Sequence, residues 1–210
     1  MNKKLFITLG IILCSIHMVS SQTNQERQEY PLKAENVSPL LIGEKIPALT
    51  LTDAMGEMIQ LGKLFSEKPT IFVIYRGGWC PYCNLQLSGL QEIEKDLTML
   101  GYQIIAVSTD KPENLKASSD KGELGYTLLS DADLSLAKAM GLAFKAPEAY
   151  HKFLPETTGG KNKDMLLPVP SVFILNKAGE IRFEYIEPNF KERVSPDLLK
   201  VVAGALYKTL

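Results

Sequence analysis

Two cysteines, Cys80 and Cys83, stand two residues apart in the stretch YRGGWCPYCN at positions 75–84. Such a pair can hold a metal ion, close a structural disulfide or carry out redox chemistry. A structural zinc ion needs about four ligands, whereas the chain beyond position 21 offers one histidine, His151, and no third cysteine. No metal is therefore expected. A disulfide that closes so short a loop restricts the unfolded chain little, so redox chemistry is the favoured interpretation.

The residues around the pair place it at the start of a predicted helix. Pro81 suits the first helical position, because its fixed φ fits there and its missing N–H is not needed. The unpaired N–H groups and the positive end of a helix stabilise a thiolate, which is the reactive form of cysteine. Trp79 is expected to shield one side of the pair and to offer an apolar surface. Cys80 at the cap and Cys83 in the first turn are therefore the candidate catalytic residues.

The elements that must position this pair alternate along the chain. Alternating residues around a turn predict a β-hairpin at 48–52 and 57–61. Apolar runs predict strands, most of them buried, at 70–75, 103–108, 126–129, 171–175 and 180–186. Helical spacing of apolar residues predicts helices at 81–100, 112–121 and 134–140, and one from about 196. This order indicates an α/β fold in which a central mixed sheet is flanked by helices. The pair falls where a central strand ends, at the edge where such sheets gather their sites.

The segment 146–168 interrupts this pattern as a loop-rich insertion. Tyr150, Phe153 and Leu154 give it apolar side chains. Two interpretations stay open for it. The segment covers the cysteines as a lid or forms a partner surface, or it is a plain surface loop.

The N-terminus has the features of a secretory signal peptide at 1–21. A basic start is followed by an apolar run at 5–16 and by small residues that end at Ser21. The run is shorter than the roughly 20 residues that span a bilayer, so cleavage is predicted and a membrane span is not. A lipoprotein signal acylated at Cys14 is the alternative. Residues 22–40 are polar and are interpreted as a tether, or as a segment that orders only on the domain surface. Export places the pair in an oxidising compartment, most naturally a bacterial periplasm.

Composition limits the partners of the remaining domain, 41–210. Apolar residues make up 45% of the chain and charged residues 22%, as in soluble globular proteins. The formal net charge is −1 and the pI is about 6.2. Because there is no basic excess, neither nucleic acid nor an anionic membrane surface is expected as a partner.

A second motif, LPVPSVF at 167–173, places Pro170 just before an apolar strand. It resembles the cis-proline turn of thioredoxin folds. The resemblance implies a cis Val169–Pro170 bond, a form that costs an X–Pro bond only about 0.5–1 kcal/mol. It also implies that Val169 and Pro170 lie against the cysteines and pair with the substrate backbone. An ordinary proline at the entry to a strand is the alternative.

From about position 41 to its end, the chain resembles the thioredoxin-like superfamily, and within it the peroxiredoxin-like alkyl hydroperoxide reductase/thiol-specific antioxidant branch. The resemblance rests on four stretches, which are IGEKIPALTLTDAMG, YRGGWCPYCNLQL, LPVPSVFILNKAGEI and EPNFKERVSP. It implies a thioredoxin-like fold and thiol-based reduction, usually of peroxides. It also implies a thioredoxin-like protein as the reductant, and no cofactor is expected.

The chain departs from the typical peroxiredoxin pattern around the pair. Those proteins place a threonine or serine three residues before the peroxidatic cysteine and a proline four residues before that. Overlaid on Cys83, these positions hold Cys80 and Arg76. The family also uses an arginine near the later strand, and there is none around Pro170. Arg76 is a candidate substitute, with a surface arginine at the strand end as the alternative. Arg193 is a weaker candidate that is expected to be structural.

The leading expectation is a thiol peroxidase. A thiolate attacks a hydroperoxide and becomes a sulfenic acid, and the other cysteine then closes a Cys80–Cys83 disulfide. The cap position and an expected exposure favour Cys80 as the attacking residue, whereas the overlay favours Cys83. A thiol–disulfide oxidoreductase acting on exported proteins is the alternative, with the same residues attacking and resolving a partner disulfide. A metal-delivery module is a third hypothesis, which the two-residue spacing and the place of His151 disfavour.

Overall fold

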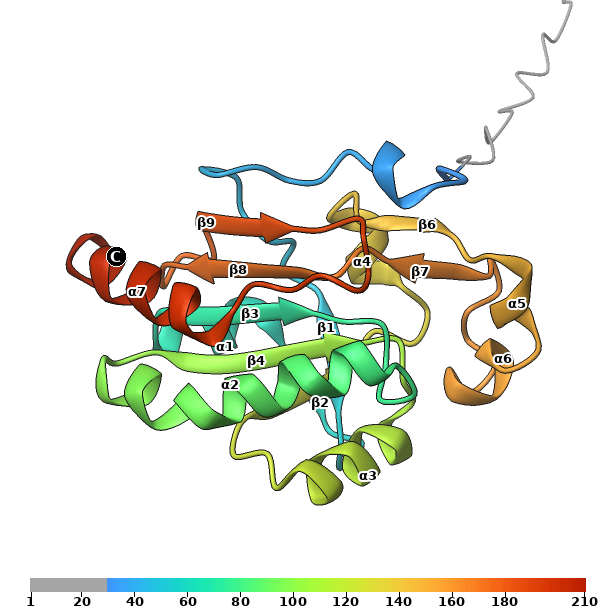
Figure 1. Ribbon diagram of the computed structural model, residues 1–210, viewed down its shortest axis with the longest axis horizontal. Coiled ribbons are helices and arrows are strands. Elements are labelled where there is room, and N and C mark those ends of the chain that lie inside the picture. Colours follow the sequence, from blue (N-terminus) through green and yellow to red (C-terminus); the bar gives the residue numbers. More distant parts are fainter. Residues whose placement is uncertain (1–29) are drawn as a thin grey trace, which may run out of the picture.

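The computed structural model describes residues 30–210 (Figure 1). The predicted signal peptide at 1–21, with Cys14, and the adjoining residues 22–29 lie outside the described residues. Residues 30–40 run along the folded domain. There the N–H of Leu40 donates to the carbonyl of Met140 at 3.1 Å, and the side chains of Val37 and Leu40 pack against the core.

Within the described residues, seven strands form one mixed sheet in the order β2-β1-β5-β4-β3-β8-β9. The pairs β3–β4 and β4–β5 are parallel, whereas β1–β2, β3–β8 and β8–β9 are antiparallel. This arrangement confirms the predicted central mixed sheet and its N-terminal hairpin. The strands are β1 (Thr50–Asp53), β2 (Met58–Gln60), β3 (Thr70–Ile74), β4 (Gln103–Ser108), β5 (Thr127–Ser130), β8 (Ser171–Leu175) and β9 (Ile181–Ile186).

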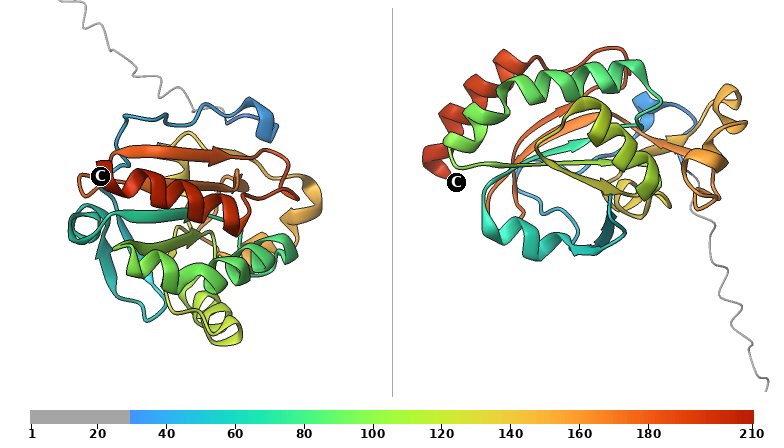
Figure 2. Two further views of the ribbon diagram at one scale, coloured as in Figure 1. Left: turned by 60° about the vertical axis from the view of Figure 1, so that its left-hand side comes forward. Right: turned by 90° about the horizontal axis from the view of Figure 1, so that it is seen from below.

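Helices cover both faces of this sheet (Figure 2). Side chains alternate along β3, so Ile71 and Val73 join one buried cluster while Phe72 and Ile74 join the other. The first cluster includes residues of α2, α3 and α7, and the second includes residues of α1 and α4. These helices are α1 (Leu61–Glu67), α2 (Pro81–Met99), α3 (Pro112–Gly122), α4 (Ser135–Ala139) and α7 (Pro196–Leu206), with short 3-10 turns at Ala34–Asn36 and Tyr207–Thr209.

The structure adds elements that the sequence analysis missed. α1 begins at Leu61, which was expected to end the hairpin, and it buries Leu61 and Phe65 one turn apart. β6 (Ala143–Lys145) pairs antiparallel with β7 (Leu166–Pro168). The insertion at 146–168 is therefore anchored by a two-stranded sheet, and it carries the short helices α5 (Glu148–His151) and α6 (Leu154–Thr157). Figure 1 shows it at one end of the molecule.

The prediction of a cis Val169–Pro170 bond is wrong, because no peptide bond among the described residues is cis. Pro168 pairs with Ala143 in the small sheet, and Ser171 pairs with Ile74 in the large one. β7 and β8 run in the same direction (Figure 1). The chain therefore passes from one ladder to the next without a reversal, and trans bonds suit this extended path.

Tyr102 ties the last helix to the core. Its ring is fully buried, and its hydroxyl donates to the carbonyl of Ala203 in α7 at 2.9 Å. We expect Tyr102→Phe to lower the free energy of unfolding by about 1 kcal/mol, the usual net value of one hydrogen bond. Urea denaturation measures the change. Tyr207→Phe serves as the control, because that ring is 40% exposed, and an equal loss in both variants would contradict the assignment.

Candidate active site

The cysteine pair lies where β3 leads into α2, at the carboxyl edge of two parallel strands. Gly77 and Gly78 form the loop before it. A β-carbon on Gly78 would lie 2.2 Å from the hydroxyl of Ser118. One on Gly77, whose φ is +149°, would lie 2.3 Å from Nε1 of Trp79. The positive φ and the close approach of the indole ring favour glycine at position 77, whereas a side chain at position 78 would require the Ser118 hydroxyl to move.

Cys80 is the N-cap residue of α2, and Pro81 follows it in the first turn as predicted. The N–H groups of Cys83 and Asn84 donate to the Cys80 carbonyl at 3.0 and 3.1 Å. Both side chains are free thiols. Cys83 is fully buried and Cys80 is only 2% exposed, so the exposure expected for Cys80 is not observed.

The two thiols differ in acidity. The Cys83 thiol donates to the Cys80 sulfur, and this hydrogen bond lowers the pKa of Cys80 to about 6. Burial opposes the change, while the Cys83 N–H and the charges of Arg76 and Arg193 assist it. The same thiol–thiol bond, together with burial, raises the pKa of Cys83 well above its usual value. At neutral pH, Cys80 therefore carries the thiolate and Cys83 keeps its proton.

Arg76 is a buried cation beside the pair, with 2% of its surface exposed. Its guanidinium carbon lies 5.1, 4.6 and 4.4 Å from the ring centroids of Trp79, Tyr150 and Phe190. Its Nε has no hydrogen-bond partner, and no ion pair within residues 30–210 includes it. A surface arginine is therefore excluded, and the unneutralised charge acts on the Cys80 thiolate.

The insertion covers this cation. Tyr150 and Phe153 pack on Trp79 with centroid distances of 5.7 and 5.0 Å, and on each other at 5.7 Å. Leu154 is buried beneath them with Leu167. These contacts place the insertion over Arg76 and Trp79, which favours a covering role over that of a plain surface loop.

Arg193 reaches the pair from the loop between β9 and α7. Its Nη2 lies 3.6 Å from the Cys83 sulfur, and its Nε donates to Oε1 of Gln86 at 2.9 Å. Its Nη1 donates to the carbonyls of Phe190 and Glu192, which folds the loop. A structural role was expected for Arg193, and the structure also places its guanidinium against the cysteine pair.

The predicted substrate-pairing turn has its backbone groups already bonded. The N–H of Val169 donates to the carbonyl of Leu142 at 2.9 Å, and the carbonyl of Pro170 accepts from Glu187 at 3.2 Å. The Val169 side chain packs in the cluster on the sheet face opposite the cysteines. Val169 and Pro170 thus have internal partners where a substrate backbone was expected.

The model of the AhpC/TSA family matches residues 42–184, which include both cysteines. The chain belongs to the AhpC/TSA family. Peroxiredoxin Bcp of Escherichia coli (strain K12) is 31% identical over 106 residues, which are 50% of this chain and 67% of that protein. The chloroplastic peroxiredoxin Q of Suaeda salsa is 28% identical over 153 residues, 73% of this chain and 63% of that one.

Solved structures agree on the fold. Peroxidoxin BcpB from Mycobacterium tuberculosis superposes with a TM-score of 0.64 at 18% identity, covering 80% of this chain and 97% of that one. The bacterioferritin comigratory protein from Xanthomonas campestris gives 0.63 at 18% identity, covering 80% and 99%. These likenesses confirm the thioredoxin-like fold that the sequence predicted.

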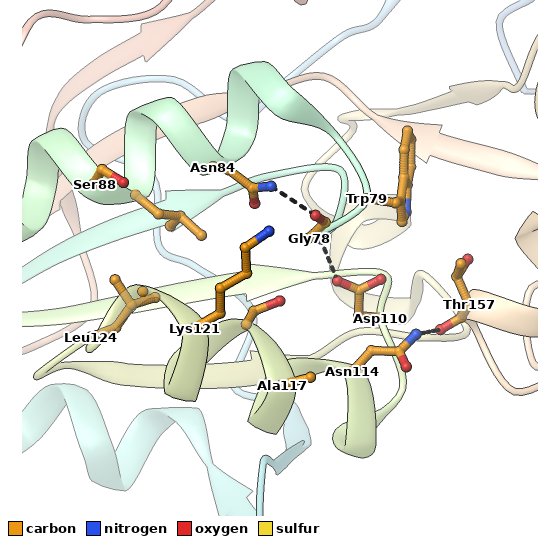
Figure 3. A pocket seen from close by; sticks show the side chains of 13 residues that line it. Gly78, Trp79, Asn84, Ser88, Asp110, Asn114, Ala117, Lys121, Leu124 and Thr157 are labelled. Atoms are coloured by element: carbon orange, nitrogen blue, oxygen red, sulfur yellow. Dashed lines mark hydrogen bonds between the residues drawn. The ribbon is translucent and has the colours of Figure 1, made fainter.

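This AhpC/TSA chain also holds its cysteine loop with polar residues that the sequence analysis missed. Oδ2 of Asp110, just after β4, accepts the Gly78 N–H at 2.6 Å, and Nδ2 of Asn84 donates to the Gly78 carbonyl at 2.9 Å (Figure 3). Burial raises the pKa of Asp110 to about 6, against the hydrogen bonds from Gly78 and Ser108. Asp110 and Asn84 line a pocket of about 360 Å³ into which Lys121 also points.

The described region also lacks two kinds of feature. Residues 30–210 contain no group of three or more His, Cys, Asp or Glu side chains placed to hold a metal ion. Of the helices in the same region, none combines the length and apolarity that a membrane span requires.

Proposed function

We propose that this AhpC/TSA protein is a thiol peroxidase that reduces hydroperoxides through Cys80 and Cys83. The observation that carries the proposal is the asymmetry of the pair within this family: a thiolate stabilised at Cys80 beside a protonated Cys83. A thiolate is the nucleophile that opens a peroxide bond. The bacterioferritin comigratory protein of Xanthomonas campestris has alkyl peroxide reduction activity, which supports the same reaction type here.

The proposed cycle requires the two cysteines and one external reductant. The Cys80 thiolate attacks the terminal oxygen of the hydroperoxide, the O–O bond breaks, and the alkoxide takes up a proton and leaves as an alcohol. The resulting Cys80 sulfenic acid condenses with the Cys83 thiol, so that a disulfide forms and water leaves. A thioredoxin-like dithiol protein then reduces the disulfide by exchange.

Arg76 and Arg193 supply the positive charge in this scheme. Both lower the pKa of Cys80, and Arg76 is buried, so its field is weakly screened. Negative charge moves from sulfur to oxygen as the O–O bond breaks, and a fixed cation stabilises it throughout. In the second step the Arg193 guanidinium beside Cys83 favours the resolving thiolate.

A single turnover tests the proposal. The reduced domain is mixed with one equivalent of hydrogen peroxide, and peroxide loss is followed together with the mass of the cysteine-containing peptides. Rapid peroxide loss with a new Cys80–Cys83 disulfide is the expected result. Slow loss of peroxide, with free thiols remaining, would refute it.

Thiol–disulfide exchange with a protein substrate is the second candidate. The same pKa difference favours it, because an attacking thiolate at Cys80 and a buried resolving thiol at Cys83 also suit a mixed-disulfide pathway. Rapid reduction of a disulfide-bonded protein, alongside slow peroxide loss, would select this activity.

The rate of peroxide consumption is expected to follow the Cys80 thiolate. Because the pKa of Cys80 is lowered to about 6, the rate should rise with pH through about 6 and level off near pH 7. Below that range the thiol is protonated and the rate falls. Stopped-flow rates and thiolate absorbance near 240 nm, titrated in parallel, measure the two curves. If both curves had their midpoint near the usual thiol pKa of about 8.5, the lowered pKa of Cys80 would be contradicted.

We place the reaction outside the cytoplasm as part of the same proposal. The order of basic, apolar and small residues at 1–21 supports export. Cell fractionation of the full-length chain, with the mature N-terminus determined by mass spectrometry, tests cleavage after Ser21 against acylation at Cys14.

A further inference from the structure

The peptide groups around Gly78 are held on both sides by side chains. On one side Asp110 accepts the Gly78 N–H at 2.6 Å, and on the other Asn84 donates to the Gly78 carbonyl at 2.9 Å. The two residues come from different elements, the end of β4 and the first turn of α2, and Figure 3 shows them on either side of the loop. Gly78 therefore has little freedom to move relative to the sheet or the helix.

The Asp110 carboxylate is itself fixed by the ends of β4 and β5. Asp110 is 1% exposed. The hydroxyl of Ser108 lies 3.3 Å from its Oδ2, and the hydroxyl of Ser130 donates to its backbone carbonyl at 2.6 Å. Asp110 lies in the loop after β4, and these bonds to the last residues of two strands restrict its movement, so it can hold the Gly78 loop in place.

Gly78 is separated from Cys80 by one residue, so its position sets that of the cysteine. The Cys80 N–H donates to the Gly77 carbonyl at 3.1 Å, which closes the loop over Gly78. The thiolate at Cys80 depends on two contacts from Cys83, the thiol and the backbone N–H. Both contacts require the N-cap geometry that this loop establishes.

We propose that Asp110 and Asn84 form a clamp on Gly78 that positions the Cys80 thiolate for reaction. Both are positioning residues, because no hydrogen bond within the described residues joins either side chain to a cysteine sulfur. The Asp110 bond is charge-assisted, which makes it the stronger half of the clamp. The proposal rests on the proposed function for its peroxide readout, whereas thiol acidity and reduction potential test it without peroxide.

Two substitutions and their combination test the clamp. Asp110→Asn keeps the shape of the side chain and removes its charge, while Asn84→Ala removes the donor to the Gly78 carbonyl. We expect each to raise the Cys80 pKa and to slow the reaction with hydrogen peroxide about tenfold, the scale on which small misplacements act. We expect the double variant to be no slower than the worse single one, since both side chains act through Gly78. Thiolate absorbance, the reduction potential against glutathione and stopped-flow rates are measured on the reduced protein.

Asn114→Ala is the matched control. Asn114 lines the same pocket, but its amide donates to the carbonyl of Thr157 at 3.3 Å rather than to Gly78. The control should keep the wild-type pKa, potential and rate. The contrary result is a lowered melting temperature in the clamp variants with an unchanged Cys80 pKa, an unchanged reduction potential and a rate within twofold of wild type. It would show that Asp110 and Asn84 have only a structural role and would overturn the proposal.

Three further outcomes can also be interpreted. Rate losses that multiply in the double variant would show independent effects and overturn the shared clamp. Should Asp110→Asn fail to fold, Asn84→Ala decides alone, because Asn84 is half-buried on the surface of α2. If the wild-type protein consumes no peroxide, the proposed function fails, and the pKa and potential still decide this proposal.

Discussion

Cys80→Ser should slow peroxide consumption at pH 7 by at least about a thousandfold, because it replaces the thiolate by a hydroxyl that stays protonated. The loss follows from the N-cap position and from the lowered pKa of Cys80. Cys83 cannot take over at this pH, since burial and the Cys80 sulfur both raise its pKa.

Cys83→Ser should behave differently. A serine hydroxyl at this position still donates to the Cys80 sulfur, so the first attack on peroxide should stay within about threefold of wild type. The variant should then stop after one turnover, because no second thiol can form the disulfide. Cys80 should accumulate as a sulfenic acid that a dimedone-type probe traps.

Rapid mixing followed by mass spectrometry of the labelled peptides separates these outcomes. Melting curves of both variants control for loss of fold. The contrary pattern is an inactive Cys83→Ser and a trapped sulfenic acid on Cys83 in Cys80→Ser. It would assign the attack to Cys83, as the overlay on typical peroxiredoxins suggests, and would mean that Arg193 rather than the N-cap activates the nucleophile.

The strands that flank the cysteines were predictable because burial on two faces leaves a continuous apolar run. β3 lies between β4 and β8 and is buried at every position. α1 was missed because Leu61 continues the alternation of β2, and only the packing of Leu61 with Phe65 against the sheet reveals the change to helical spacing. The isomer at Pro170 depends on tertiary context, since the local preference for trans is small.

The residues that support the pair were harder to find than the pair itself. Cys80, Cys83, Arg76 and Trp79 lie in one stretch, and their spacing carries the information. Arg193 lies 110 residues from Cys83 along the chain, and Asp110 lies 32 residues from Gly78. Only the adjacency of β3 and β4 brings that carboxylate to the loop. An acid directly after a strand that neighbours the redox strand was the available signal.

Replacing Arg76 by an apolar residue should affect stability and activity in opposite directions. Replacing even a buried ion pair by apolar residues of similar volume is often neutral or stabilising by about 1–4 kcal/mol, and a buried guanidinium without a carboxylate partner lacks the attraction that offsets the cost of burying a charge. Methionine fits the aromatic surroundings of Arg76 and makes favourable contacts with rings. Arg76→Met should therefore unfold at the same temperature as the wild type or at a higher one.

The same substitution should slow peroxide reduction about 100-fold at pH 7, the lower end of the loss seen when one fixed group that stabilises transition-state charge is removed. The Cys80 pKa should rise, because the Arg76 charge is one of the contributions that lower it. Part of the rate should return at pH 9, where the thiolate forms unaided, and the part that does not return measures direct stabilisation of the peroxide oxygens. Arg182→Met is the matched control, since Arg182 is partly exposed and pairs with Glu180 at 3.8 Å. A variant with lower thermal stability and an unchanged rate would show instead that Arg76 serves the fold and that the thiolate owes its acidity to Cys83 and the helix start alone.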